Sequence, residues 1–308
     1  MNTLHESQSS SSNPSGIVSP LRWSRNVKWT RAGLSVDVDD PLLAFLDDPN
    51  LKIRAFKQYK STIRRDLKQL LDLLALFNAK GTFFIPGYIL QEAPDLLDVL
   101  ADTEHEIASH GCKHRFLTQW TAEEFEQDIS QSIQLIRKYS GRTVSGYRAP
   151  GLTLAPVAKW AVPILLKYHF TYSSSTPSLP ARQHNYLLTT KQPFYWEGGL
   201  LEIPLSSHHN IPVCGSFYSR IIPHKITQYL TRRYIRDSYL PLFYYCHPFE
   251  VFPEHNSEAT QYLPAVSKLY FMNCDSYVDK LKWFLAEQAC DTYANIIRDL
   301  KAEKAGKL

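Results

Sequence analysis

Short apolar segments alternate along this chain with longer segments in which apolar residues recur every three or four positions. The short segments GLSV (33–36) and TFFI (82–85) predict buried strands. The longer segment 64–81 between them predicts an amphipathic helix that ends at Gly81. The apolar face of this helix is formed by Leu67, Leu70, Leu71 and Leu74.

The same alternation continues through the rest of the chain. Pro94 marks a helix start, and a long helix is expected from Thr121, which forms a capping box with Glu124. The buried face of that helix is expected to contain Phe125, Ile129, Ile133 and Ile136. Further strands are expected within 106–111, 144–151, 170–175, 200–206 and 242–249, and further helices within 223–238 and 276–289.

This order of elements favours one class of fold. Strands that alternate with helices pair in parallel through right-handed crossovers. We therefore expect an α/β fold, and an irregular (β/α) barrel rather than an open doubly wound sheet. In such a barrel the functional residues lie at the carboxyl ends of the strands.

Length and composition limit the organisation of the protein. With 308 residues and 44% hydrophobic content, the chain can bury a large core, so we expect a single catalytic domain over 25–303. The polar, Ser-rich residues 1–24 are expected to form a disordered tail. The net charge of +4 does not indicate a nucleic-acid partner.

Two further features of composition bear on location. No segment approaches the ~20 consecutive apolar residues that a membrane helix needs, and the first residues contain no apolar leader. The five cysteines are odd in number and show no metal-type spacing, which fits reduced thiols. We therefore expect a cytoplasmic protein. The basic segment 231–238 allows transient contact with a membrane surface, although a solvated helix face is the preferred interpretation.

Three aspartates follow the first predicted strand in SVDVDDP (35–41). Because side chains alternate along a strand, Asp37 and Asp39 point to one side, and Asp40 points away or into the turn before Pro41. Two carboxylates that face one pocket repel each other unless a cation or a proton is present. A solvated loop or a helix cap explains the three residues equally well when they are considered alone.

A pair of histidines follows another predicted strand, in SHGCKH (109–114). His110 and His114 can bind one metal if they lie on a helical turn, and neutral imidazole suits zinc. The competing interpretation is a solvated turn. With one carboxylate, the two imidazoles fill three positions of a tetrahedral zinc and leave the fourth for water. The same ligands also suit iron, which we rank lower because a second carboxylate remains to act as a base.

Five motifs together resemble those of the polysaccharide deacetylase superfamily, carbohydrate esterase family four. They are SVDVDD (35–40), SHGCKH (109–114), GYRAPG (146–151), LEIPLS (201–206) and YYCHPFE (244–250), and they extend the resemblance over about residues 31–250. Within the superfamily, YHFTYSSS (168–175) is most similar to a cytoplasmic branch associated with exopolysaccharide loci.

The resemblance implies a role for each matching residue. The metal ligands would be Asp39, His110 and His114, with Zn²⁺ or another divalent metal such as Co²⁺ as the cofactor. Asp37 would be the catalytic base, Arg148 would hold it through a bidentate contact, and His247 would be the general acid that protonates the departing amine. The backbone amide of Gly151 is a candidate oxyanion donor.

The sequence departs from the family pattern at several positions. Val38 separates the first two aspartates, which leaves Asp40 as an alternative to Asp39 for the metal ligand. Leu152 occupies the position of the last glycine in the family's usual Arg-x-Pro-x-Gly pattern, which begins here at Arg148. An Asp-x-x-Asp-Trp stretch that would orient His247 is missing, so Glu202 and Glu250 are the candidates for that task. Cys112, between the two histidines, is expected to be inert.

These observations predict a metal-dependent hydrolase that removes an acetyl or similar small acyl group from an N-acylated sugar. The substrate would be a carbohydrate, or a lipid-linked or nucleotide-linked sugar. Aromatic residues at 194–196 and 217–219 suit sugar stacking, although core packing is the more common role. The alternatives are an amidase acting on a non-sugar or cyclic amide and, ranked below it, a catalytically dead carbohydrate-binding relative.

Overall fold

The computed structural model describes residues 17–18, 28–42, 62–177, 191–253, 261–263 and 271–304. Of the polar segment 1–24, only Ile17 and Val18 are within these ranges. They form β1 (Ile17–Val18) and pair antiparallel with β7 (Phe194–Trp196), so the predicted tail is not disordered at these two residues. The rest of that segment lies outside the described residues.

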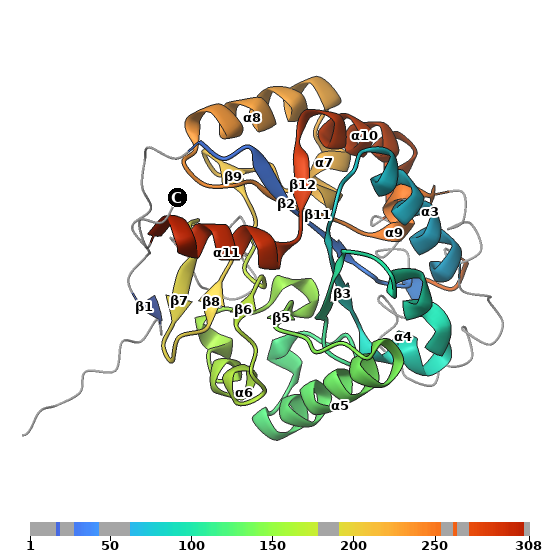
Figure 1. The fold of residues 1–308 in the computed structure, drawn as a ribbon, viewed down its shortest axis with the longest axis vertical. Coiled ribbons are helices and arrows are strands. Elements are labelled where there is room, and N and C mark those ends of the chain that lie inside the picture. The colour runs from blue at the N-terminus through green and yellow to red at the C-terminus, as the bar shows by residue number, and fades with distance from the viewer. Residues whose placement is uncertain are drawn as a thin grey trace, which may run out of the picture.

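A curled and mostly parallel sheet forms the centre of the fold (Figure 1). The strands follow one another in the order β1, β7, β8, β6, β5, β4, β3, β2 and β11, and β12 also pairs with β2. From β8 to β11 in this order, neighbouring strands run parallel. At the other edge, β7 is antiparallel to β8 and β1 is antiparallel to β7. This is the irregular α/β barrel that the alternation of elements predicts.

The strands of this sheet are short. The parallel ones are β2 (Arg31–Asp37), β3 (Thr82–Ile85), β4 (Glu106–Ser109), β5 (Gly146–Tyr147), β6 (Tyr172–Ser173), β8 (Leu201–Glu202), β11 (Phe243–Cys246) and β12 (Ala289–Asp291). A separate hairpin pairs β9 (Ser207–His208) with β10 (Ile211–Pro212).

Helices surround the sheet (Figure 1). They are α3 (Ile63–Leu76), α4 (Gly87–Glu92), α5 (Ala122–Ser140), α6 (Ala161–Lys167), α7 (Ser216–Ile221), α8 (His224–Asp237), α9 (Pro248–Val251), α10 (Tyr277–Glu287) and α11 (Tyr293–Lys304). Short 3₁₀ helices occur at η1 (Pro94–Leu100), η2 (Leu117–Gln119), η3 (Pro150–Leu152), η4 (Pro156–Ala158) and η9 (Cys274–Ser276). None of the helices in the described ranges is long and apolar enough to cross a membrane.

The sheet is buried on both faces. Because side chains alternate along a strand, Phe83 and Ile85 pack on one face in the main core with α3 and α5, and Phe84 points to the other. That second face is covered by α11, whose Tyr293 and Ile296 pack in the same cluster as Phe84. Burial on both faces accounts for the continuous apolar runs in the sequence.

The helix starts and ends predicted from the sequence differ from the structure in two respects. Thr121 and Glu124 form the predicted capping box of α5, with Oγ1 of Thr121 accepting from the Glu124 amide at 3.2 Å. Pro94 begins a helix as predicted, but of the 3₁₀ type. The prediction that Gly81 ends the preceding helix is wrong. That helix ends at Leu76, and Asn78 adopts the left-handed φ of 50° that turns the chain.

Candidate active site

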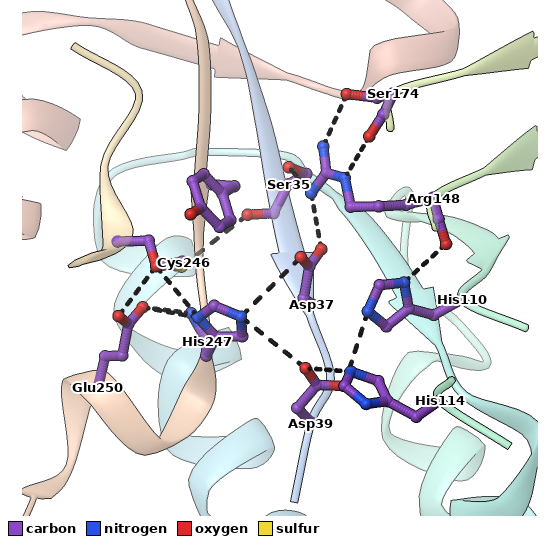
Figure 2. A network of polar contacts seen from close by, with 12 residues as sticks. Ser35, Asp37, Asp39, His110, His114, Arg148, Ser174, Cys246, His247 and Glu250 are labelled. Carbon is purple, nitrogen blue, oxygen red and sulfur yellow. Dashed lines mark hydrogen bonds and ion pairs between the residues drawn. The ribbon is translucent and has the colours of Figure 1, made fainter. Parts of the chain in front are cut away.

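The carboxyl ends of four parallel strands bring the six predicted site residues together (Figure 2). Asp37 is the last residue of β2 and Asp39 follows it. His110 follows β4, Arg148 follows β5 and His247 follows β11. Parallel pairing places all these strand ends at one rim, so residues up to about 200 positions apart become neighbours.

Three of these residues form a candidate metal centre. The possible ligand atoms of Asp39, His110 and His114 all lie within 4.8 Å of one another. Nε2 of His114 lies 3.1 Å from Oδ2 of Asp39, and Nε2 of His110 lies 3.9 Å from Oδ1 of Asp39. All three side chains are at least nine-tenths buried.

The chemistry of these donors fits a divalent metal. Nδ1 of His110 lies 2.8 Å from the Arg148 carbonyl oxygen, which can only accept, so this nitrogen carries the proton and Nε2 keeps its lone pair. Oδ1 of Asp39 is buried and, among the described residues, has no hydrogen-bond partner. A buried carboxylate oxygen beside two imidazoles is the arrangement that a bound cation satisfies.

The charge states agree with this interpretation. Burial lowers the pKa of His110 below its usual value, which favours the neutral ring that a metal requires. Burial alone would raise the pKa of Asp39, but His114 and His110 outweigh it and bring that pKa below the ordinary range. Asp39 is therefore a buried and ionised carboxylate.

The loop that carries the two histidines is not helical. The helical turn that was the condition for a shared metal is not formed, because Gly111 and His114 adopt left-handed φ values of 72° and 50°. Asp128 of α5 holds the loop instead. Its Oδ2 accepts from the Cys112 amide at 2.7 Å and its Oδ1 accepts from the Lys113 amide at 2.8 Å.

Asp128 is not among the site residues predicted from the sequence, although the sequence contains a signal for it. Asp128 lies on the face of α5 that also buries Phe125 and Ile129, so it is a carboxylate inside an apolar stripe. Buried carboxylates require hydrogen-bond donors, and the loop amides of Cys112 and Lys113 supply them. The helix position alone could not show which loop lies opposite Asp128.

The geometry also distinguishes Asp39 from Asp40. Asp39 is the aspartate that groups with the two histidines. Oδ1 of Asp40 instead accepts from the Leu42 amide at 3.0 Å, which stabilises the turn after the strand. The alternation of side chains along the strand therefore predicts the orientation of both residues correctly.

Asp37 belongs to a second buried pair at this rim. Nη1 of Arg148 donates to Oδ1 of Asp37 at 2.6 Å (Figure 2). The predicted bidentate contact is wrong, because Nε and Nη2 of Arg148 donate to the carbonyl and the hydroxyl of Ser174, both at 2.9 Å. Ser174, which directly follows β6, thus holds the guanidinium of Arg148 in place, and the guanidinium in turn holds Asp37.

The guanidinium of Arg148 is fully buried against aromatic rings. Cζ of Arg148 lies 4.2 Å from the centroid of Phe84 and 5.5 Å from that of Tyr293. Burial by itself would lower the pKa of Arg148, but Asp37 outweighs it and raises that pKa. A permanent positive charge therefore lies beside Asp37.

His247 faces both aspartates. Its Nε2 lies 3.9 Å from Oδ2 of Asp37 and 3.8 Å from Oδ2 of Asp39. Its Nδ1 lies 2.9 Å from Oε2 of Glu250. Burial lowers the pKa of His247, but Glu250 and the two aspartates more than compensate and raise it to about 8.

Of the two glutamates considered for orienting His247, Glu250 makes the contact. Oε1 of Glu202 accepts from the amides of Ser175 and Thr176 at 2.7 and 3.0 Å, so it orders the segment that holds Arg148. Within the described part of the chain, no hydrogen bond of the Gly151 backbone amide is observed, and its role as an oxyanion donor stays a prediction.

Ser216 also lies beside His247 but cannot form a serine triad with it. Its Oγ is 3.3 Å from Nδ1 of His247, on the side of the ring where Glu250 binds. In a Ser-His-acid triad the serine and the acid contact opposite ring nitrogens. The arrangement therefore argues against a serine nucleophile.

Other features singled out in the sequence have structural roles. Phe194 and Trp196 are fully buried, which makes them core residues rather than sugar-stacking walls. Burial raises the pKa of the Cys112 thiol to about 12, in agreement with an inert cysteine. All five cysteines lie within the described residues, are buried and form no disulfide there.

Comparison with known proteins relates two parts of the chain to family models. Residues 58–163, which contain His110, His114 and Arg148, match the family model described as polysaccharide deacetylase. This match spans about a third of the chain and supports the resemblance to the polysaccharide deacetylase superfamily. Residues 173–298 match a second model, described as a domain of unknown function (DUF3473).

The second matched region is not a separate structural unit. Its strands β8, β11 and β12 belong to the same sheet as β3, β4 and β5 of the first region. β8 pairs with β6, and both β11 and β12 pair with β2, which precedes the first region. It also contributes Ser174, His247 and Glu250 to the rim. The region of unknown function therefore completes both the sheet and the site.

Curated relatives match this chain over short stretches. A peptidoglycan deacetylase of Helicobacter pylori is 28% identical over 109 residues, which are 35% of this chain and 36% of the relative. The peptidoglycan-N-acetylmuramic acid deacetylase PdaA of Bacillus subtilis is 28% identical over 82 residues, 27% of this chain and 31% of the relative. The chain thus matches about a third of the length of these relatives.

A solved structure supports the fold over nearly the whole chain. A Mycobacterium smegmatis protein assigned to the polysaccharide deacetylases superposes with a TM-score of 0.59. The superposition covers 94% of this chain and 95% of that one, at 22% sequence identity. At this identity the likeness concerns the fold.

Proposed function

We propose that this protein is a metal-dependent hydrolase that releases acetate, or a similarly small acid, from the amide nitrogen of an N-acylated sugar. The observation that carries the proposal is the meeting of Asp39, His110 and His114 at 4.8 Å or less, beside Asp37 and His247. The family and the names of the curated relatives support an acylated sugar as the substrate.

Asp39, His110 and His114 would hold the divalent metal, zinc or cobalt, which when bound lowers the pKa of water and polarises the acyl carbonyl. Asp37 accepts the proton of the attacking water as the new C–O bond forms, and Arg148 keeps this carboxylate in place. Nε2 of His247 gives its proton to the amide nitrogen as the C–N bond breaks. Without that proton the amine is a poor leaving group.

A substrate panel tests the proposal. Acetate release would be measured from N-acetylglucosamine oligomers, nucleotide-linked and lipid-linked sugars, and small cyclic amides, each with added zinc or cobalt. Turnover of a sugar amide supports the proposal. Turnover of cyclic amides alone identifies the amidase alternative, and binding of sugars without any turnover identifies a carbohydrate-binding relative.

The proposal includes a place of action. Five buried cysteines that form no disulfide among the described residues fit a reducing compartment, and we propose that the enzyme acts on an intracellular precursor, as expected for the exopolysaccharide-associated branch. Contact of α8 with a membrane surface stays a prediction. Basic side chains of this helix already have acidic partners, because Arg232 pairs with Glu287, and Arg233 and Arg236 pair with Asp237.

A further inference from the structure

An exposed aromatic ring lies beside the candidate active site and takes no part in the mechanism proposed above. Phe116 follows the candidate metal ligand His114 by two residues, and it is 38% exposed. Leu76 is exposed as well, but it ends α3 a few residues before β3 begins, at the end of the sheet opposite the rim. Phe116 differs from such a residue by its place next to the reacting groups.

Hydrogen bonds fix the loop that carries Phe116. The Phe116 amide donates to Oε1 of Gln119 at 3.0 Å, and the Gln119 amide donates to the Phe116 carbonyl at 2.9 Å. The amide of the buried Leu117 donates to Oγ1 of Thr153 at 3.0 Å. Because Thr153 lies two residues after Gly151, these contacts tie the loop to the turn that contains the candidate oxyanion donor.

The ring of Phe116 packs directly on Gly151. Gly151 adopts a left-handed φ of 63°, and a β-carbon on it would lie only 2.5 Å from Cε1 of Phe116. A residue with a side chain at this position would therefore displace the ring. The Gly151 turn supports one part of the ring, and the rest is open to solvent.

Trp120, a second aromatic residue of this segment, is already covered in part. Cζ of Arg115 lies 4.2 Å from the centroid of the Trp120 ring. Nη2 of Arg115 donates to the Gln119 carbonyl at 2.7 Å, and Nε1 of Trp120 donates to the Arg115 carbonyl at 3.2 Å, which keeps the two side chains together. Phe116 is therefore the better candidate for contact with a ligand.

An aromatic ring that is fixed and partly exposed can bind a sugar ring by stacking. The less polar face of a pyranose presents C–H groups, whose partial positive charge complements the negative face of the aromatic ring. Because hydrogen bonds already hold the Phe116 loop, stacking orders little additional backbone. The position and the chemistry of Phe116 thus suit a saccharide ligand.

The sugar on Phe116 would differ from the sugar that carries the reacting amide. In the proposed reaction the amide nitrogen lies at Nε2 of His247, which is 3.8 Å from Oδ2 of Asp39. His114, which leads to Phe116, lies on the other side of Asp39 (Figure 2). A substrate whose amide is at His247 therefore reaches Phe116 with a neighbouring sugar.

We propose that Phe116 forms a stacking subsite for a second sugar ring, next to the sugar that loses its acyl group. The substrate class is then a chain of at least two sugars, free or attached to a carrier, and not a single N-acylated sugar. This inference rests on the proposed function, because it names the substrate class of the same site.

Dependence on substrate length tests the subsite. The ratio of kcat/KM for an N-acetylglucosamine tetramer to kcat/KM for the monomer should fall ~3- to 10-fold in Phe116→Ala, because only the tetramer reaches the ring. Bound zinc should be measured in the same preparations. An unchanged ratio would overturn the proposal, and so would loss of zinc, which would show that Phe116 supports the metal centre instead.

Matched variants separate stacking from other effects of substitution. Phe116→Tyr keeps a flat ring and should keep the wild-type ratio, whereas Phe116→Leu keeps an apolar side chain without the ring and should behave like Phe116→Ala. Leu76→Ala removes an apolar side chain that is 81% exposed at the opposite end of the sheet, and it should not change the ratio. A wild-type ratio in Phe116→Leu, or a lowered ratio in Leu76→Ala, would exclude stacking as the cause.

A binding measurement decides the inference independently of turnover. Asp37→Asn should bind the tetramer without hydrolysing it, and calorimetry would compare this variant with the double variant Asp37→Asn with Phe116→Ala. Binding of the tetramer should be ~3- to 10-fold weaker in the double variant. If the wild-type protein hydrolyses neither substrate, the proposed function fails. The subsite fails if the tetramer does not bind or binds both variants equally.

Discussion

Arg148 and Asp37 form a fully buried ion pair, with 2.6 Å between Nη1 and Oδ1. Asp39, two residues further along the chain, faces His110 and His114 instead. Two carboxylates with the same orientation at one strand end therefore have different partners. Different partners imply different roles, and substitutions at the two positions should have separable effects.

Asp37→Asn should leave metal binding intact and lower turnover by ~10²- to 10⁴-fold, because the proposed ligands remain while the base is lost. Asp39→Asn should lose the metal itself. Bound zinc and acetate release would be measured for both variants, with Asp40→Asn as the control that keeps metal. Loss of metal in Asp37→Asn, or in Asp40→Asn, would show that the assignment of the three aspartates is incorrect.

Arg148→Ala should destabilise the fold as well as slow the reaction. Removing the guanidinium leaves Asp37 as an uncompensated buried charge, which typically costs about 3–5 kcal/mol. Chemical denaturation would measure the loss. The double variant Arg148→Ala with Asp37→Asn should recover part of it, whereas a double variant no more stable than the single one would exclude charge burial as the cause.

Asp128→Ala should weaken metal binding even though Asp128 is not a proposed ligand. Its carboxylate accepts from the Cys112 and Lys113 amides, and without it the loop between the two histidines loses its anchor. Loss of such support typically lowers metal affinity by ~10- to 100-fold. Zinc titration against a chromogenic chelator measures the change. Unaltered affinity would mean that the loop holds its shape without Asp128.

Removal of the metal should abolish turnover and lower thermal stability. A ligand that binds only the native state stabilises it, so the melting temperature should rise with zinc concentration and fall after chelation. His114→Ala should remove this dependence, because one ligand of three is lost. Full metal content in His114→Ala would exclude His114 as a ligand.

The cysteines should not react with thiol reagents while the protein is folded. Burial raises the pKa of Cys112, Cys274 and Cys290 to about 12 and raises that of Cys246 as well, which removes the reactive thiolate at neutral pH. A thiol titration should therefore detect all five cysteines only after denaturation. Rapid modification of the native protein, lost in Cys112→Ser, would show that Cys112 is accessible.

Local features of this protein follow from the sequence alone. The alternation of apolar segments predicts the parallel sheet, and the period-two orientation of side chains separates Asp37 and Asp39 from Asp40. A capping box such as that of Thr121 acts within one helical turn. Signals of this kind are short-range, because the interacting groups are at most a few residues apart.

The features that only the tertiary structure decided depend on contacts between segments that are distant in the sequence. The sequence does not show that Asp128 supports the histidine loop, that Ser174 takes the donors of Arg148 expected on Asp37, or that Glu250 rather than Glu202 contacts His247. A buried polar side chain requires a partner, and that requirement is visible in sequence. The identity of the partner is set by how β2, β4, β5 and β11 converge at one rim, which no local pattern of residues encodes.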